Sequence, residues 1–296
     1  MLGTVDVTPI PLGSWPTPLE PAPRLAAALG LDELWIKRDD LTGLGGGGNK
    51  VRKLQYTCAQ ALRAGATRLV TTGAAQSNHA RLTAAAAARL GLECTLVLRG
   101  DPPKSPRGNL ILDELAGASV VWAGDAPLDE VAAAQDGYLI PLGGTTPVSA
   151  LGYVDCAREL LTQLPDLATV VVALGSGGTM AGLVAHLGPQ RVYGVNVGAL
   201  PDPRATVTDL LAGMGVTVDP AALLIDESHV GAGYAALTDP VRSALVLAAR
   251  TEGLFLDPTY TGRALAGLRA NPPDGKVVFL HTGGLPGLFG HPDLAD

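Results

Sequence analysis

A lysine follows a run of glycines near the start of the chain, in residues 43–53, which read Gly-Leu-Gly-Gly-Gly-Gly-Asn-Lys-Val-Arg-Lys. Glycine lacks a Cβ atom, so such a loop can adopt left-handed backbone conformations and approach a ligand closely. The lysine, Lys50, is predicted to lie in the first turn of a helix, where the helix dipole disfavours a positive charge. These features favour a nucleophilic amine over the alternative, a solvated lysine beside a flexible loop. A P-loop is not indicated, because Val51 stands where Ser or Thr would bind magnesium.

A second glycine-rich loop, residues 175–179, reads Gly-Ser-Gly-Gly-Thr and follows a continuous apolar segment. Where a buried strand leads into a helix, backbone N–H groups and the helix dipole can bind a phosphate. The hydroxyl groups of Ser176 and Thr179 add hydrogen-bond donors. A dinucleotide site would need a glycine at Met180 and an acidic residue at the end of the next strand, so NAD is not expected. The alternative is a helix start that needs glycine only for close packing.

Polar side chains also occur at the ends of other predicted strands and at the starts of helices. They are Gln76, Ser77, Asn78 and His79; Tyr260 and Thr261; and His281 and Thr282. Ligands of open α/β sheets bind at the carboxyl ends of the strands, so these groups are expected to form one site. The simpler alternative for Ser77 or Asn78 is an N-cap that has no further role.

A reactive lysine, a phosphate loop and polar strand ends together favour pyridoxal 5′-phosphate as cofactor. Its aldehyde needs a lysine, and its phosphate needs a loop of this kind. The non-enzyme alternative is a binding module for an anionic metabolite. Such a module would need the loop at 175–179 but would have no use for Lys50.

The bulk composition predicts a compact enzyme. The chain has 296 residues, 47% hydrophobic and 17% charged, which allows one large domain or two smaller ones and excludes a disordered protein. Its net charge of −7 argues against nucleic acid or an anionic membrane as partner. Residues 1–18 show no signal-peptide pattern and no apolar run could span a bilayer, so a cytoplasmic location is expected. Cys58, Cys94 and Cys156 are predicted to be buried thiols, without a disulfide framework or a metal site.

Strands alternate with helices along most of the chain, which predicts βαβ units and a parallel sheet. Strands are expected at 33–38, 68–72, 93–98, 119–122, 137–140, 169–174, 191–197 and 276–281. Helices are expected at 25–29, 51–62, 78–90, 107–115, 128–134, 149–164, from the 175–179 loop to 187, and at 204–211, 240–251 and 262–269. The proline-rich start is expected to be an extended arm. Residues 143–147 are expected to connect two α/β lobes, with the ligand between them.

Five motifs resemble the D-cysteine desulfhydrase and 1-aminocyclopropane-1-carboxylate deaminase family, fold-type-II pyridoxal-phosphate enzymes related to tryptophan synthase β. They are Lys-Arg-Asp-Asp-Leu-Thr-Gly at 37–43, Gly-Asn-Lys-Val-Arg-Lys-Leu at 48–54, Gln-Ser-Asn-His-Ala-Arg at 76–81, Asp-Pro-Thr-Tyr-Thr-Gly at 257–262 and His-Thr-Gly-Gly-Leu-Pro-Gly-Leu-Phe at 281–289. The resemblance spans nearly the whole chain. It implies a two-domain open twisted parallel-sheet fold, with a large cofactor-binding domain at 1–48 and 149–296, a small inserted domain at 49–148, and a homodimer.

The resemblance also implies roles for individual residues. Lys50 is expected to be the Schiff-base lysine and the base acting on Cα. Ser77, Asn78 and His79 would hold the substrate carboxylate and the cofactor ring oxygen; Ser176, Gly177, Gly178 and Thr179 would bind the phosphate; and Tyr234 and Tyr260 would be the active-site tyrosines, catalytic together with Lys50 and Ser77.

Two threonines distinguish the activities of the family. Deaminases of the family carry a glutamate and a leucine at the positions of Thr261 and Thr282. A hydroxyl group pairs with an unprotonated ring nitrogen, a weaker electron sink that suffices when a thiolate leaves from Cβ. The resemblance therefore implies elimination of D-cysteine, a small amino acid, to pyruvate, sulfide and ammonia. The alternatives are 1-aminocyclopropane-1-carboxylate deaminase and L-cysteate sulfo-lyase. The glycine run and the short region 201–234 depart from the family pattern.

Overall fold

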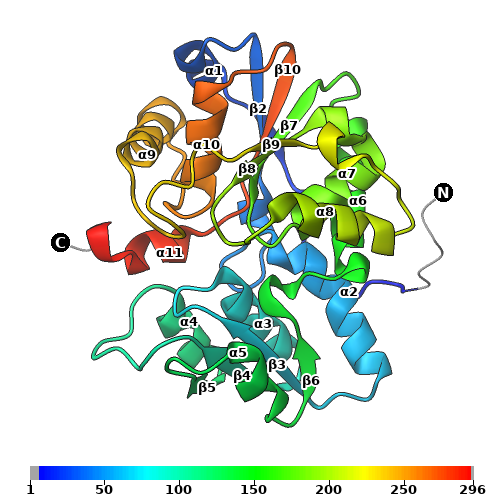
Figure 1. Cartoon of the computed structure of the whole chain (residues 1–296), viewed down its shortest axis with the longest axis vertical. Helices are drawn as coiled ribbons and strands as arrows, with labels where there is room; N and C mark the ends of the chain where they lie inside the picture. The colour runs from blue at the N-terminus through cyan, green and yellow to red at the C-terminus, as the bar shows by residue number, and fades with distance from the viewer. Residues whose placement is uncertain (1–6, 295–296) are drawn as a thin grey trace.

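Two sheets, built from different stretches of chain, organise the part of the protein that the computed structural model describes, residues 7–294 (Figure 1). The larger sheet contains, in spatial order, β1 (Leu19–Pro21), β2 (Glu33–Lys37), β10 (Lys276–Leu280), β7 (Thr169–Leu174), β8 (Val192–Asn196) and β9 (Leu224–Asp226). The smaller sheet contains β5 (Ser119–Trp122), β4 (Glu93–Leu98), β3 (Arg68–Gly73) and β6 (Tyr138–Ile140). Residues 1–6 of the predicted arm, and of the segment read for a signal peptide, lie outside the described residues.

Neighbouring strands run parallel in both sheets, except that β1 is antiparallel to β2. The α/β fold with parallel sheets is therefore as predicted. β10 is the last strand in the chain, yet it lies between β2 and β7, with Phe279 opposite both Ile36 and Val171. The first and last parts of the chain thus join in the centre of one sheet.

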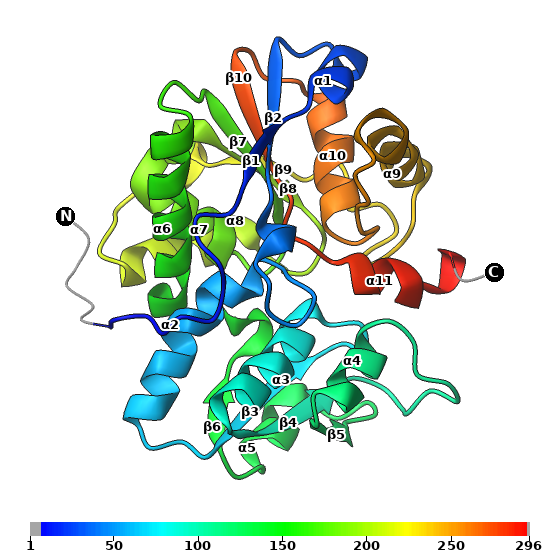
Figure 2. The same ribbon diagram turned by 180° about the vertical axis from the view of Figure 1, so that it is seen from behind.

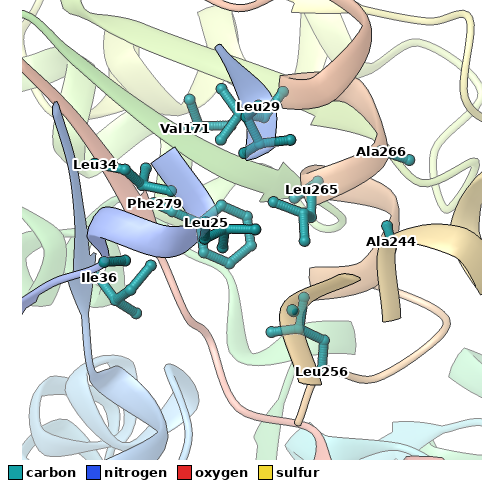
Figure 3. Close-up of a cluster of buried hydrophobic side chains, with 14 of the residues drawn as sticks. Leu25, Leu29, Leu34, Ile36, Val171, Ala244, Leu256, Leu265, Ala266 and Phe279 are labelled. Atoms are coloured by element: carbon teal, nitrogen blue, oxygen red, sulfur yellow. The ribbon is translucent and has the colours of Figure 1, made fainter. Parts of the chain in front are cut away.

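Helices cover both faces of the larger sheet (Figures 1 and 2). One face packs against α1 (Pro23–Leu29), α9 (Asp239–Glu252) and α10 (Thr261–Ala270), and the other against α6 (Pro147–Gln163), α7 (Gly178–Leu187) and α8 (Pro203–Gly213). Successive side chains of a strand point to opposite faces, so Val171 belongs to the first core and Val170 and Val172 to the second. Figure 3 shows Leu25 of α1 and Leu265 of α10 around Phe279. Burying a side chain such as Phe279 stabilises the fold by about 1.5–3 kcal/mol.

The smaller sheet also has helices on both faces. Its helices are α3 (Asn78–Leu90), α4 (Asn109–Leu115) and α5 (Leu128–Ala133). The helix predicted at 78–90 is α3, whose small side chains, including Ala80, Ala84 and Ala87, are fully buried. On the opposite face Val70 and Val97 pack against Ala132 of α5.

Helix α2 (Lys50–Arg63) lies between the two sheets (Figures 1 and 2). Its apolar side, with Leu54 and Cys58, joins the core of the smaller sheet. Its other side meets α6 so closely that a Cβ atom on Gly152 would lie 2.3 Å from the carbonyl oxygen of Arg52. The helix that starts at Lys50 is thus held by both parts of the molecule.

All the strands and helices predicted from the sequence are present, with ends that agree within about two residues. Apart from short 3₁₀ helices, two strands and one α-helix were not predicted: β1, β9 and α11 (Leu285–Gly290). The three cysteines are free and buried, as predicted. In residues 7–294 there is no cluster of three His, Cys, Asp or Glu side chains suited to a metal ion, and no helix is long and apolar enough to cross a membrane. The domain limits at 48/49 and 148/149 stay predictions.

Candidate active site

The glycine run is folded against the chain itself. A Cβ atom on Gly47, whose φ is +75°, would lie 1.7 Å from the carbonyl oxygen of Asp40. The backbone N–H of Gly48 donates to Thr42 Oγ1 at 2.9 Å, and the N–H of Asn49 donates to the carbonyl of Thr282 at 3.0 Å. The glycine run therefore packs closely against the segments that follow β2 and β10. This packing fixes the point at which α2 begins.

Lys50 lies at the start of α2, as predicted, and lines the cavity between the sheets. Its Nζ atom is 3.3 Å from Asn49 Oδ1 and 5.9 Å from the centre of the Tyr260 ring. Burial lowers the pKa of its amine to about 8, while the charge of Asp257 acts to raise the pKa and that of Arg81 acts to lower it. The sequence argument for an uncharged amine relied on the helix dipole, whereas burial is the main cause of the lowered pKa of Lys50.

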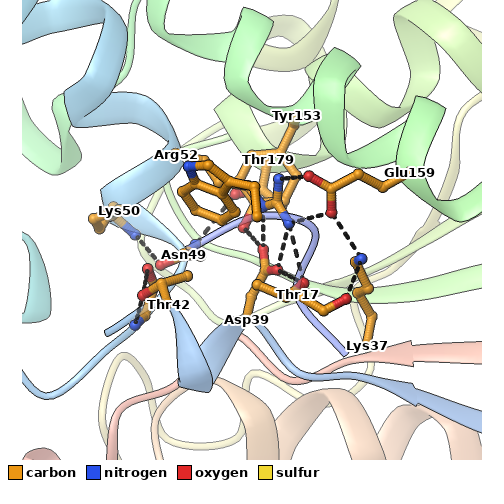
Figure 4. Close-up of polar contacts among 12 residues, drawn as sticks. Thr17, Lys37, Asp39, Thr42, Asn49, Lys50, Arg52, Tyr153, Glu159 and Thr179 are labelled. Atoms are coloured by element: carbon orange, nitrogen blue, oxygen red, sulfur yellow. Dashed lines mark hydrogen bonds and ion pairs between the residues drawn. The ribbon is translucent and has the colours of Figure 1, made fainter. Parts of the chain in front are cut away.

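A buried ion network anchors α2 two residues after Lys50 (Figure 4). The guanidinium of Arg52 donates to both carboxylate oxygens of Asp39, at 2.8 and 2.9 Å, and to both of Glu159, at 2.9 and 2.8 Å. Tyr153 of α6 donates to the same Asp39 at 2.7 Å, and Lys37 donates to Glu159 at 2.8 Å. Charge on Arg52 holds the pKa of Asp39 below its usual value despite burial. The network fixes the helix that carries Lys50 to β2 and α6.

The loop at 175–179 joins β7 to α7, and Gly177 is the residue before the helix, with φ +85°. The hydroxyl of Ser176 lies 2.6 Å from Thr145 Oγ1, and that of Thr179 accepts a hydrogen bond from Asn49 Nδ2 at 3.2 Å. The loop therefore combines free N–H groups at a helix start with side-chain hydroxyls, the combination that suits a phosphate.

A second lysine, Lys53, lies beside this loop. Its Nζ donates to Thr145 Oγ1 at 2.8 Å and to Ser176 Oγ at 3.4 Å, and a Cβ atom on Gly178 would lie 2.9 Å from it. No individual role was predicted for Lys53 from the sequence. The available signal was its spacing from Lys50, because residues three apart in a helix lie on the same side of the helix.

Ser77 is the N-cap of α3, since its Oγ accepts the N–H of Ala80 at 3.1 Å. Ser77 is thus an N-cap, but its hydroxyl proton stays available and its side chain also lines the cavity, so the cap does not exclude the predicted role.

His79 is fully buried and lies 2.9 Å from Thr71 Oγ1 through Nε2. Because the Thr71 hydroxyl donates to the carbonyl of Ile140, it can only accept from His79, so the imidazole proton is on Nε2. Burial holds the pKa of His79 well below its usual value, and Nδ1 has no partner among residues 7–294. His79 therefore offers no free N–H to a carboxylate in this geometry. Of the three residues expected to bind the substrate carboxylate, Ser77 and Asn78 remain as donors.

Two tyrosines from distant segments meet in the cavity. The hydroxyl groups of Tyr234 and Tyr260 form a hydrogen bond, and burial raises the pKa of both.

Arg263, fully buried in α10, holds the segment that carries Tyr234. Its guanidinium donates to the carbonyls of Val197, Val230, Gly233 and Ala236 at 2.7–2.9 Å.

The two threonines that distinguish the activities lie in different surroundings. Thr282 lines the inner part of the cavity. Thr261 is fully buried, donates to Asp257 Oδ1 at 2.7 Å, and accepts from the N–H of Asp257 at 2.8 Å. Asp257 in turn accepts the N–H groups of Thr259, Tyr260 and Thr261 at the start of α10. The structure therefore does not bring Thr261 to the cavity wall, where the sequence reading placed it.

Ten of the twelve predicted site residues line one continuous space. An inner part is bordered by Lys50, Asn78, Ser176, Gly177, Thr179, Tyr260 and Thr282, and an outer part of about 330 Å³ by Lys50, Ser77, Asn78, His79, Ser176, Tyr234 and Tyr260. Gly178 and Thr261 lie behind these walls. An amine of lowered pKa, a helix start with Lys53 for a phosphate, and a volume typical of ligand sites fit pyridoxal phosphate. The individual roles stay predictions.

Comparisons with known proteins agree with this geometry. The family model for pyridoxal-phosphate dependent enzymes matches residues 10–283. A solved homologue of 1-aminocyclopropane-1-carboxylate deaminase is 35% identical, with a TM-score of 0.88 over 97% of this chain and 95% of that one. A threonine deaminase of T.th. (23% identity, TM-score 0.68, 90% and 92% of the two chains) and an L-serine ammonia-lyase of the fungus Rhizomucor miehei (19%, 0.69, 92% and 94%) share the fold.

Proposed function

This chain belongs to the family of pyridoxal-phosphate dependent enzymes and is a lyase of that family, and we propose that its substrate is D-cysteine, cleaved to pyruvate, sulfide and ammonia. When bound, the cofactor withdraws electrons from Cα of the amino acid. The strength of this withdrawal depends on whether a carboxylate or a hydroxyl group meets the ring nitrogen, and that choice separates the possible reactions.

One observation carries the proposal: no carboxylate of the described residues lines either part of the cavity, and Thr282 does. Asp257, a buried carboxylate close to Lys50, has both oxygens occupied by Thr261 and the start of α10. Without a carboxylate in the cavity wall, the ring nitrogen of a bound cofactor would stay unprotonated, and the cofactor would be a weak electron sink. A weak sink suits departure of a thiolate from Cβ better than opening of a cyclopropane ring.

The chain's own residues supply the other parts of the reaction. Lys50 holds the cofactor, and its pKa of about 8 leaves part of the free amine uncharged near neutral pH, ready to remove the Cα proton. Ser77 and Asn78 present donors for the substrate carboxylate, and Asn78 also presents one to the ring oxygen of the cofactor. Tyr260 and Tyr234, with raised pKa values, stay protonated and can donate to the departing sulfur. The N–H groups of the 175–179 loop and Lys53 bind the phosphate.

Arg99 favours a second candidate, L-cysteate. Its side chain lines the outer cavity, donates to the carbonyl of Ala126 at 3.2 Å, and forms no ion pair with another described residue. The same part of the cavity is also lined by the apolar side chains of Leu128, Leu142 and Leu200. A lone cation in such surroundings attracts an anion, and the sulfonate of cysteate is a leaving group on Cβ.

The deciding experiment compares products across substrates. Pyruvate is measured with D-cysteine, L-cysteine, L-cysteate and β-chloro-D-alanine, and 2-oxobutyrate with 1-aminocyclopropane-1-carboxylate. We expect D-cysteine to give the highest kcat/KM. Faster release of 2-oxobutyrate would overturn the reading of Thr282 and favour the deaminase. If L-cysteate is the best substrate and Arg99→Gln raises its KM about tenfold while Arg24→Gln, an exposed control, does not, the sulfo-lyase replaces the desulfhydrase. Absence of product from every substrate would favour a binding module.

The remaining proposals concern partners and location. The family resemblance supports a homodimer, and the net charge of −7 argues against nucleic acid or anionic membranes as partners. We propose that the protein is a cytoplasmic homodimer. Analytical sedimentation at several protein concentrations would determine the mass of the assembly.

A further inference from the structure

Asn109, the first residue of α4, is fully buried behind the wall that carries Asn78. Its Oδ1 accepts from Arg81 Nε at 2.7 Å, and its Nδ2 donates to the carbonyl of Gln76 at 3.0 Å and to Asn78 Oδ1 at 3.1 Å. All three hydrogen-bonding groups of the Asn109 side chain are thus used. No role for Asn109 or Arg81 follows from the site described above.

Chemistry alone fixes the orientation of both amides. A guanidinium only donates, so the atom of Asn109 that faces Arg81 must be its oxygen. The NH₂ group of Asn109 therefore faces the Gln76 carbonyl, which only accepts, and Asn78. It follows that Asn78 turns its oxygen toward Asn109, which leaves its NH₂ group for the cavity. That NH₂ group has no hydrogen-bond partner among residues 7–294.

Arg81 connects the same arrangement to Lys50. Its guanidinium is fully buried and donates to the carbonyl of Gly45 and, at 3.1 Å, to that of Gly47, in the glycine run that leads to Lys50. Burial lowers the pKa of Arg81 to about 10, so the group stays charged at neutral pH. Asp113, buried one turn after Asn109, lies close to Arg81, and burial raises the pKa of Asp113 to about 7, so it carries only part of a negative charge at neutral pH. One cation therefore holds the backbone before Lys50 and, through Asn109, the amide of Asn78.

We propose that Arg81 and Asn109 form a positioning pair, which presents the NH₂ group of Asn78 to an acceptor oxygen of the bound cofactor and fixes the glycine run before Lys50. The proposal rests on the proposed contact of Asn78 with the cofactor. A donor held in a single orientation binds an acceptor more tightly than a rotating amide does, because no rotamer freedom is lost on binding. The pair acts through Asn78 and touches no reacting atom.

Asn109→Asp tests the pair. Aspartate keeps the side-chain volume and pairs with Arg81, yet it cannot donate to Asn78, whose amide is then free to present its oxygen to the cavity. We expect the Kd for pyridoxal phosphate to rise about tenfold and the absorption band of the bound cofactor to shift. The melting temperature of the cofactor-free protein should fall, because the new carboxylate oxygen also faces the carbonyl of Gln76. Adding Asn78→Ala to Asn109→Asp should weaken binding no further, because both changes remove the same contact.

Controls separate this inference from the proposed function. Asn271→Asp, in an exposed position far from the cavity, should leave the Kd and the absorption band unchanged. If Asn109→Asp does not fold, Asn109→Ala also removes the donor and is read in the same way. Parental Kd and parental absorption for the folded variant would overturn the positioning pair, whatever substrate the enzyme proves to use. Additive effects of Asn78→Ala and Asn109→Asp would also overturn it.

Discussion

The hydroxyl groups of Tyr234 and Tyr260 lie 2.5 Å apart, although one belongs to a loop and the other precedes α10. Their rings meet edge to face, with centroids 6.1 Å apart and planes inclined by 71°. Within such a pair one hydroxyl donates to the other, so a single proton remains for a third group. Burial raises the pKa of Tyr260 well above its usual range, which makes a phenolate base implausible at neutral pH.

Replacing each tyrosine by phenylalanine should therefore show which one gives its proton to the leaving group. We expect the variant that lacks the donor to lose about 100-fold or more in kcat, and the other variant to lose less, because it removes only the neighbour. Steady-state kinetics with the best substrate measure this, with Tyr138→Phe in the smaller sheet as control. Two variants with nearly parental kcat would exclude the pair from the reaction.

Lys50→Ala should abolish both the visible absorbance of bound cofactor and all product formation, because no other amine replaces the covalent attachment. Lys104→Ala, an exposed lysine outside the cavity, is the matched control and should change neither. A Lys50→Ala protein that retains a cofactor-linked amine after borohydride treatment would place the attachment elsewhere, and Lys53 would then be the first lysine to examine.

The lowered pKa of Lys50 predicts how the cofactor-free protein captures pyridoxal phosphate. The amine is protonated below its pKa of about 8, so the capture rate should rise about tenfold per pH unit from pH 6 and level off above pH 8. Stopped-flow absorbance measures the rate. With a free lysine side chain, whose pKa is about 10.4, the capture rate should keep rising through the same pH series. A capture rate independent of pH would show that burial does not control this amine.

The hydroxyl of Thr179 should contribute to cofactor affinity through the phosphate loop. Thr179→Ala removes it together with the hydrogen bond from Asn49, so we expect about tenfold weaker binding and largely restored binding in Thr179→Ser. Equilibrium titration of the cofactor-free protein gives the Kd. Gly177→Asp, with a negative charge at this loop, should weaken retention more. Parental affinity in both variants would mean that the phosphate binds elsewhere.

The buried ion network should be worth far more than an exposed ion pair. Arg52→Met leaves Asp39 buried without its cation and should cost about 3–5 kcal/mol in the free energy of unfolding. Arg158→Ala breaks the exposed pair with Asp155 and should cost at most about 1 kcal/mol. Urea denaturation of the cofactor-free proteins compares them. Equal costs would show that the network adds nothing specific to the anchoring of α2.

The sequence predicted those strands and helices whose own residues show a clear apolar or alanine-rich pattern. β7 is an unbroken valine-rich segment because both faces are covered, and α3 is alanine-rich because it packs closely. β1 and β9 have three residues each and lie at the two edges of the sheet. Such short strands exist because a neighbouring strand offers hydrogen bonds, and nothing in Leu-Glu-Pro or Leu-Ile-Asp reveals that neighbour.

Convergence of the site was predictable in part, because parallel strands of one sheet end at the same edge, which brings Ser176 after β7 and Thr282 after β10 together. Asn78 follows β3 of the other sheet, and only the packing of the two sheets brings it to the same cavity. The direction in which a side chain points at the start of a helix was not predictable. Thr261 follows Tyr260 in sequence, yet it turns into the protein toward Asp257. Arg99 carried no motif, and only the fold shows that it lines the cavity.

The packing of the glycine run determines which of its positions can vary among relatives of this protein. At Gly47 the neighbouring carbonyl of Asp40 excludes any side chain, whereas at Gly46 the nearest atom to a Cβ would be 3.5 Å away. Gly46 also has φ +81°, in the region that asparagine tolerates best after glycine. Natural sequence drift and random mutagenesis should therefore leave Gly47 invariant and replace Gly46 mainly by asparagine, so the run is a constraint on backbone shape and carries little information about substrate.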